Sequence, residues 1–164
     1  MMPTISDVRA KLLARTEGSK LVMPSAKNEI YLDLNGDGLA DLAMIDSRGD
    51  FTGNGQITTF AVDLGFDGEF DLYMIDNDGN WVGDEIIYFK DGESVPVIKT
   101  HPEKSGNMIE SVLAEPTTKF LGMIKGFLGG AMDEAAFKIG MQECVVAVRG
   151  ALRNVLTAYQ LGKQ

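Results

Sequence analysis

The sequence predicts an α+β fold, in which an antiparallel β-meander of about five strands packs against N- and C-terminal helices. Short β-prone runs alternate with Gly- and Asp-rich turns in the middle of the chain, which is typical of a meander. Both ends show the apolar spacing of helices. The chain of 164 residues is long enough to bury a core, so we expect a single domain over residues 1–164.

The negative charge is concentrated in the middle of the chain. Residues 33–84 hold eleven Asp and one Glu against one basic residue, Arg48, whereas the whole chain has a net charge of −9. The same stretch contains nine of the nineteen glycines. Short carboxylates among glycines are typical of tight loops. Because so much uncompensated charge repels itself in a compact fold, we expect a bound cation and no nucleic acid partner.

Residues 29–90 form two acidic β repeats with an offset of thirty residues, since IYLDLNGDGLADLAMID at 30–46 aligns with FAVDLGFDGEFDLYMID at 60–76. The repeats predict strands over 29–32, 42–45, 56–62, 72–75 and 85–89. Successive turns of a meander lie at opposite edges of the sheet. The first and third acidic loops should therefore share one edge.

Each repeat contains two nine-residue loops, and the four loops span 33–41, 46–54, 63–71 and 76–84. All four have Asp or Asn at their first, fifth and ninth positions. Calcium takes six to eight oxygen ligands, which a loop supplies through alternate carboxylates and a backbone carbonyl. The loops therefore predict sites for two to three Ca²⁺ ions. The candidate ligands are Asp33, Asn35, Asp37, Leu39, Asp41, Asp63, Asp67, Glu69, Asp71, Asp76, Asp78, Asn80, Val82 and Asp84.

The four loops differ in how complete their ligand sets are. Loop 33–41 is complete, with Gly38 at the sharp turn, whereas loop 63–71 has Gly65 at its third position, where we expect a water. Loop 46–54 has Arg48 at that position, so we expect it to bind no ion of its own. The pattern excludes an EF-hand, because the twelfth position of every loop is apolar.

DLNGDGLADL at 33–42 matches the pattern D-x-[DN]-x-D-G-x-x-D-L at every fixed position, and DLGFDGEFDL at 63–72 matches at all but one. With β-prone runs on either side, residues 29–90 resemble the FG-GAP and VCBS-like calcium-binding repeats. The resemblance implies structural calcium held by the loop carboxylates, and a role in adhesion or in carbohydrate-associated surface proteins. It does not imply a propeller, because repeats of that family are longer and more numerous.

Helices are expected at both ends of the chain. A helix over 4–17 is capped by Thr4, and an edge strand at 20–23 follows it. Residues 91–116 are expected to form a loop-rich connector with a helical turn or two over 107–115, and 117–160 to form helices broken at Gly129–Gly130. The last helix, over 131–159, should pack on the sheet through Phe137, Met141, Val145, Val148, Leu152, Val155 and Tyr159. A second apolar flank comprises Met132, Ala136, Ile139 and Val146.

These features favour a calcium-binding structural or interaction module that is not an enzyme, with the C-terminal helix contacting a protein partner or a second copy. A membrane-active or self-assembling protein and a small metal-dependent hydrolase remain alternatives. The membrane alternative is disfavoured because FLGMIKGFLGGAM contains one basic residue, Lys125. Calcium loops favour an extracellular or cell-surface location, although no signal peptide is visible in the first thirty residues.

Overall fold

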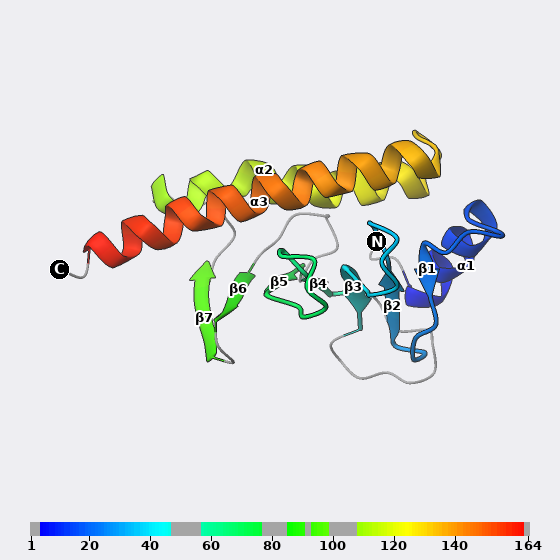
Figure 1. Cartoon of the computed structure of the whole chain (residues 1–164), viewed down its shortest axis with the longest axis horizontal. Coiled ribbons are helices and arrows are strands. Elements are labelled where there is room, and N and C mark those ends of the chain that lie inside the picture. Colours follow the sequence, from blue (N-terminus) through cyan, green and yellow to red (C-terminus); the bar gives the residue numbers. More distant parts are fainter. Residues whose placement is uncertain (1–3, 47–56, 77–84, 91–92, 99–107, 163–164) are drawn as a thin grey trace.

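The computed structural model describes residues 4–46, 57–76, 85–90, 93–98 and 108–162. The α+β fold predicted from the sequence is confirmed within them, as a β-meander with one N-terminal and two C-terminal helices (Figure 1). The elements are α1 Ile5–Arg15, β1 Val22–Met23, β2 Glu29–Leu32, β3 Leu42–Ile45, β4 Thr59–Val62, β5 Leu72–Ile75, β6 Glu85–Lys90, β7 Glu93–Ile98, α2 Met108–Leu128 and α3 Glu134–Gly162.

The seven strands lie in chain order, β1 to β7, and every neighbouring pair is antiparallel. The two repeats form hairpins of the same register, since Leu32 pairs with Leu42 and Val62 pairs with Leu72. Each pair flanks one acidic loop. The first and third loops therefore lie at the same edge of the sheet, as the repeat predicts.

The sheet is wider than the predicted five-stranded meander, because the expected edge strand is present as β1 and a further strand follows β6. The loop-rich connector expected over 91–116 is wrong at residues 93–98, and the helical turns expected over 107–115 belong to a long helix. Residues Glu93–Ile98 form β7, and α2 begins at Met108. Pro96 fits β7 because this strand is at the edge of the described sheet, where a missing backbone N–H is tolerated. Pro116 lies inside α2, where it removes one helical hydrogen bond without ending the helix.

Helices α2 and α3 pack against each other and run side by side across the strands (Figure 1). Helix α1 lies at the β1–β2 end of the sheet and contacts both β2 and α2. Its N-cap is Thr4, whose Oγ1 accepts a 3.1 Å hydrogen bond from the N–H of Asp7, as predicted. None of the helices that the structure describes is long and apolar enough to cross a membrane.

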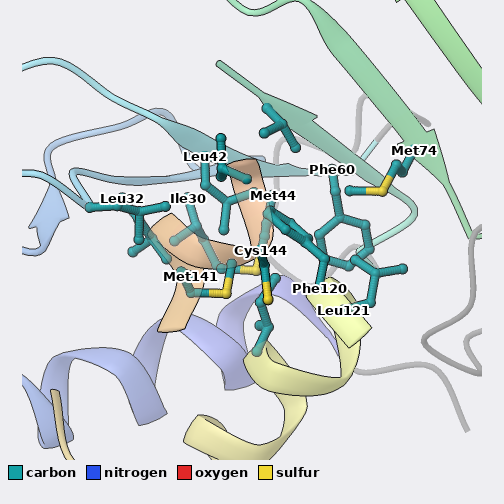
Figure 2. Packing of buried hydrophobic residues seen from close by; sticks show 14 of the residues in the cluster. Ile30, Leu32, Leu42, Met44, Phe60, Met74, Phe120, Leu121, Met141 and Cys144 are labelled. Atoms are coloured by element: carbon teal, nitrogen blue, oxygen red, sulfur yellow. The ribbon is translucent and has the colours of Figure 1, made fainter. Parts of the chain in front are cut away.

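The core lies between the sheet and the three helices (Figure 2). Alternate residues of β2 to β5 point into it, and Phe60 of β4 lies near Phe120 of α2 at its centre. The predicted packing stripe of α3 is confirmed for Phe137, Met141, Val145, Val148 and Leu152, all of which are buried. The side chains of Val155 and Tyr159 lie outside the described residues.

The second apolar flank of α3 is mostly exposed, contrary to what its composition suggests. Ile139 and Val146 are 62% and 51% exposed, and only Met132 packs partly against the core. The reason is geometric, since a helix lying on a flat layer buries one narrow stripe. The break between α2 and α3 falls where predicted, with Gly130 in the left-handed region at φ 89°.

Candidate metal centre

The first acidic loop, residues 33–41, is folded around the carboxylate of Asp33. One oxygen of this carboxylate accepts a 2.8 Å hydrogen bond from the N–H of Gly36, and the other accepts a 2.9 Å bond from the N–H of Gly38. Both glycines are left-handed, with φ of 79° and 84°, which an L side chain adopts only under strain. The glycines therefore let the chain wrap tightly around Asp33.

Asp41 closes the loop from its other end. Its Oδ2 accepts hydrogen bonds from the N–H groups of Leu34, at 2.7 Å, and Asn35, at 3.3 Å. The side chain is fully buried, and its Oδ1 has no hydrogen-bond partner among the described residues. Leaving a buried carboxylate oxygen unpaired is costly, so a positively charged partner at this atom would stabilise the fold.

The loop brings three carboxylates into one cluster. Asp33, Asp37 and Asp41 each offer an oxygen, and these three atoms lie within 4.8 Å of one another. Burial raises the pKa of Asp41 to about 6, against hydrogen bonds from Leu34 and Asn35 that lower it, and the charges of Asp37 and Asp33 raise it further. A cation in the cluster would relieve this repulsion.

The loop over 63–71 repeats this arrangement thirty residues later. Asp63 accepts from the N–H groups of Gly65, at 3.2 Å, and Gly68, at 2.7 Å, while Oδ2 of Asp71 accepts from the N–H of Leu64 at 3.1 Å. Oxygens of Asp63, Asp67 and Asp71 form a second group within 4.8 Å. Burial is the main cause that raises the pKa values of Asp63 and Asp71.

The second triad differs from the first at one strained position. Phe66, at the place of Gly36, is the only non-glycine residue with a positive φ, 54°, within the described chain. Its side chain is partly buried against the core. The packing of the ring therefore offsets a backbone conformation that costs roughly 1–2 kcal/mol for an L residue.

The two loops touch each other at the shared edge. A Cβ built on Gly68 would lie 3.1 Å from Cδ1 of Leu39, so the tip of loop 33–41 packs on the turn of loop 63–71. Gly68 is also left-handed, at φ 94°. A glycine is therefore needed at position 68 both for the turn of loop 63–71 and for the close approach of Leu39.

Helix α3 contacts both loops through two polar side chains that the sequence pattern did not predict as part of the site. The Nε2 group of Gln142 donates a 2.8 Å hydrogen bond to the carbonyl of Leu34, and a guanidinium N–H of Arg149 donates a 3.1 Å bond to the carbonyl of Leu64. In the sequence, the one feature that points to these contacts is the spacing of Gln142 and Arg149, which lie seven residues apart beside the apolar stripe of the helix.

The remaining candidate ligands have different places. The side-chain oxygen of Asn35 accepts the N–H of Asp37 at 3.2 Å, whereas Leu39 and Glu69 are exposed and Glu69 lies outside the triad. Asp76 is buried at the opposite edge, where its N–H donates to Thr58. The other candidates in the fourth loop lie outside the described residues, namely Asp78, Asn80, Val82 and Asp84. Most of loop 46–54, which we expected to be empty, also lies outside them.

No family model, curated protein or solved structure gives a significant match to this chain. The described residues define an α+β protein with two acidic triads, each of which brings three carboxylate oxygens close enough together to hold a metal ion.

Proposed function

We propose that the chain is a calcium-binding module, in which the cations neutralise and order the acidic loops of the sheet. The observation that carries this proposal is Oδ1 of Asp41. It is a buried carboxylate oxygen without a hydrogen-bond partner among the described residues, and it belongs to a side chain clustered with Asp33 and Asp37. A bound cation would supply the missing partner and offset the charge of all three acids.

Calcium suits this loop better than magnesium. In our proposal Asp33, Asp37 and Asp41 supply carboxylate oxygens, and Asn35 and the carbonyl of Leu39 complete the set. Such mixed and irregular oxygen cages are typical of calcium, whereas magnesium needs a near-ideal octahedron and keeps several waters. The resemblance of residues 29–90 to FG-GAP and VCBS-like repeats supports the same ion.

The role we propose for the carboxylates is structural, not catalytic. Both oxygens of Asp33 and both oxygens of Asp63 accept backbone N–H groups of their own loops. Carboxylates held in this way brace a turn around an ion. They are poorly placed to exchange protons with a substrate, which disfavours the metal-dependent hydrolase.

The test is a calorimetric titration of the calcium-free protein with Ca²⁺ and, separately, with Mg²⁺. We expect at least two calcium ions to bind, with magnesium much weaker. The variant Asp37→Asn combined with Asp67→Asn removes one exposed acid from each triad and should lose both sites. Equal affinity for the two metals, or calcium binding unchanged in the double variant, would contradict the proposal.

The interaction role is best supported by an exposed side of α3 that borders loop 33–41. Ile139 and Val146 line an open hollow of about 370 Å³ on this helix, together with Gln142 and Glu143. Exposed aliphatic side chains grouped in this way fit contact with another protein or a second copy of the chain. Sedimentation of the wild type and of Val146→Glu tests this, because a self-association interface would be lost in the variant.

A further inference from the structure

Leu34 and Leu64 occupy the second position of their loops, and each links its loop to α3. The N–H of Leu34 donates to the carboxylate of Asp41, and its carbonyl accepts from Gln142. Leu64 makes the same two bonds, donating to Asp71 and accepting from Arg149. Each helix side chain is thus one residue away from the carboxylate that closes a triad.

The spacing of the two helix residues matches the spacing of the repeats. Gln142 and Arg149 are seven residues apart, which is two turns and about 10.5 Å along a helix. The two loops follow β2 and β4, which are two positions apart in the sheet and therefore separated by roughly 9.6 Å. Because α3 runs across the strands (Figure 1), one face of the helix reaches both loops, through Gln142 and Arg149.

We propose that Gln142 and Arg149 are positioning residues, each of which fixes one acidic loop to α3 and sets the cation affinity of that loop. This inference rests on the proposed calcium function. By reciprocity, a cation bound in loop 33–41 strengthens the attachment through Gln142, whereas a cation bound in loop 63–71 weakens the attachment through Arg149.

The charges of the two helix residues follow the charges of the loops. Loop 63–71 contains four acidic residues and contacts Arg149, whereas loop 33–41 contains three and contacts the neutral Gln142. Each loop with its helix partner therefore carries a formal charge of −3. The guanidinium of Arg149 offsets the additional acid, Glu69, and so weakens cation binding in the more acidic loop.

The experiment uses the full chain and follows the backbone amides of Gly38 and Gly68 by NMR during a calcium titration. These amides donate to Asp33 and Asp63, so each reports on its own loop. Gln142→Ala should weaken binding at loop 33–41 several-fold and change loop 63–71 by less than twofold. Arg149→Gln keeps a hydrogen-bond donor and removes a positive charge, so it should raise the calcium affinity of loop 63–71 about fivefold. This is the effect expected in water from a unit charge roughly 8 Å from a divalent ion.

The reverse substitution, Gln142→Arg, should lower the calcium affinity of loop 33–41 by about the same factor. Lys138→Gln is the charge control, because it removes a cation from α3 about 16 Å further along the helix from Arg149. It should leave loop 63–71 unchanged. Equal effects on both loops from any single variant would mean that the helix acts only on overall stability, and would overturn the proposal. Weaker binding in Arg149→Gln would overturn the charge argument.

Hydrogen exchange in calcium-free protein separates this inference from the proposed function. Gln142→Ala should accelerate exchange of the Leu34 amide and not of the Leu64 amide, since only the first loop loses its attachment. If the wild type binds no calcium, the proposed function and the assignment of cation affinity both fail, and this exchange pattern decides whether the attachment stands. Uniform acceleration of both amides overturns the attachment itself.

Discussion

The backbone N–H of Asp63 donates a 2.9 Å hydrogen bond to the backbone carbonyl of Asp41. This bond joins the residue that closes loop 33–41 to the residue that opens loop 63–71. Both side chains are 0% exposed, so two buried carboxylates lie on directly paired residues. Without a cation, each carboxylate is buried near like charges of its own loop, Asp33 and Asp37 for Asp41 and Asp67 for Asp63. The metal-free protein is therefore expected to be destabilised at the two triads.

The first prediction concerns Asp41→Asn. The substitution removes a buried charge but keeps an oxygen that can accept from Leu34 and Asn35. In calcium-free buffer we expect the free energy of unfolding to rise by about 1–3 kcal/mol, because the variant no longer buries a charge near Asp33 and Asp37. In calcium at a hundred times the dissociation constant, the wild type gains about 2.7 kcal/mol per site and the variant loses that gain at the first loop. Urea unfolding with and without calcium measures both effects.

Asp37→Asn is the matched control, because Asp37 belongs to the same triad and is exposed. It should reduce calcium affinity at the first loop while changing the calcium-free stability by less than about 0.5 kcal/mol. If Asp41→Asn destabilised the calcium-free protein, this would contradict the inference that Asp41 buries an unpaired charge at a cost to stability.

The second prediction is the pH dependence of calcium-free stability. The pKa of Asp41 is raised from 3.8 to about 6 by burial, and burial also raises the pKa of Asp63 and Asp71. The folded state therefore binds protons more tightly than the unfolded state. The stability from these groups is present in full below about pH 4 and is lost as pH rises through about 6. Urea unfolding at pH 5 and pH 7 should show wild type losing stability relative to Asp41→Asn.

Calcium reverses this dependence, because a cation favours the ionised carboxylates. Binding at pH 5.5 should therefore release protons, which calorimetry detects as a binding enthalpy that changes with the ionisation enthalpy of the buffer. Proton uptake, or an enthalpy that is the same in every buffer, would show that these carboxyls are not the ligands.

The two triads were predictable because their information is local. Asp33, Asp37 and Asp41 lie within one nine-residue loop between two strands, so their spacing alone brings them together. The repeat at an offset of thirty residues also predicts that both loops lie at the same edge of the sheet. The glycine at the sixth position of each loop is left-handed as its place in the pattern requires, at φ 84° for Gly38 and 94° for Gly68.

Other features depend on contacts between distant parts of the chain. Gln142 binds the carbonyl of Leu34 across 108 residues, and no local pattern encodes a bond from a side chain to a backbone carbonyl. By local preference, Pro96 and Pro116 should each interrupt a strand or helix. Instead, Pro96 lies in the edge strand β7, and Pro116 lies inside α2, which packs on α3. Phe66 adopts a conformation normal for glycine because its ring packs on the core. In each case tertiary packing outweighs the local preference.

The third prediction separates backbone strain from contact between the loops. Gly38→Ala should destabilise the protein by about 1–2 kcal/mol through its left-handed backbone alone, because nothing lies within 4 Å of the added Cβ. Gly68→Ala should cost more, since its Cβ would lie 3.1 Å from the side chain of Leu39. Adding Leu39→Ala should recover that excess and nothing further. Thermal unfolding of the three variants tests this, and equal losses at both glycines would show that the loops do not pack together.

The fourth prediction compares the two sides of α3. Leu152 is 3% exposed in the core, whereas Ile139 is 62% exposed on the same helix. Leu152→Asp puts a carboxylate into an apolar layer and loses the packing of a large side chain, so it should cost at least about 3 kcal/mol or prevent folding. Ile139→Asp should change stability by less than about 0.5 kcal/mol, because that position faces solvent. Leu152→Ala, with an expected loss of about 2–5 kcal/mol, keeps the comparison measurable where Leu152→Asp does not fold. Urea unfolding, at a concentration where the wild type is monomeric, measures these losses of stability. Equal losses in Leu152→Ala and Ile139→Asp would mean that α3 does not pack on the sheet through this stripe.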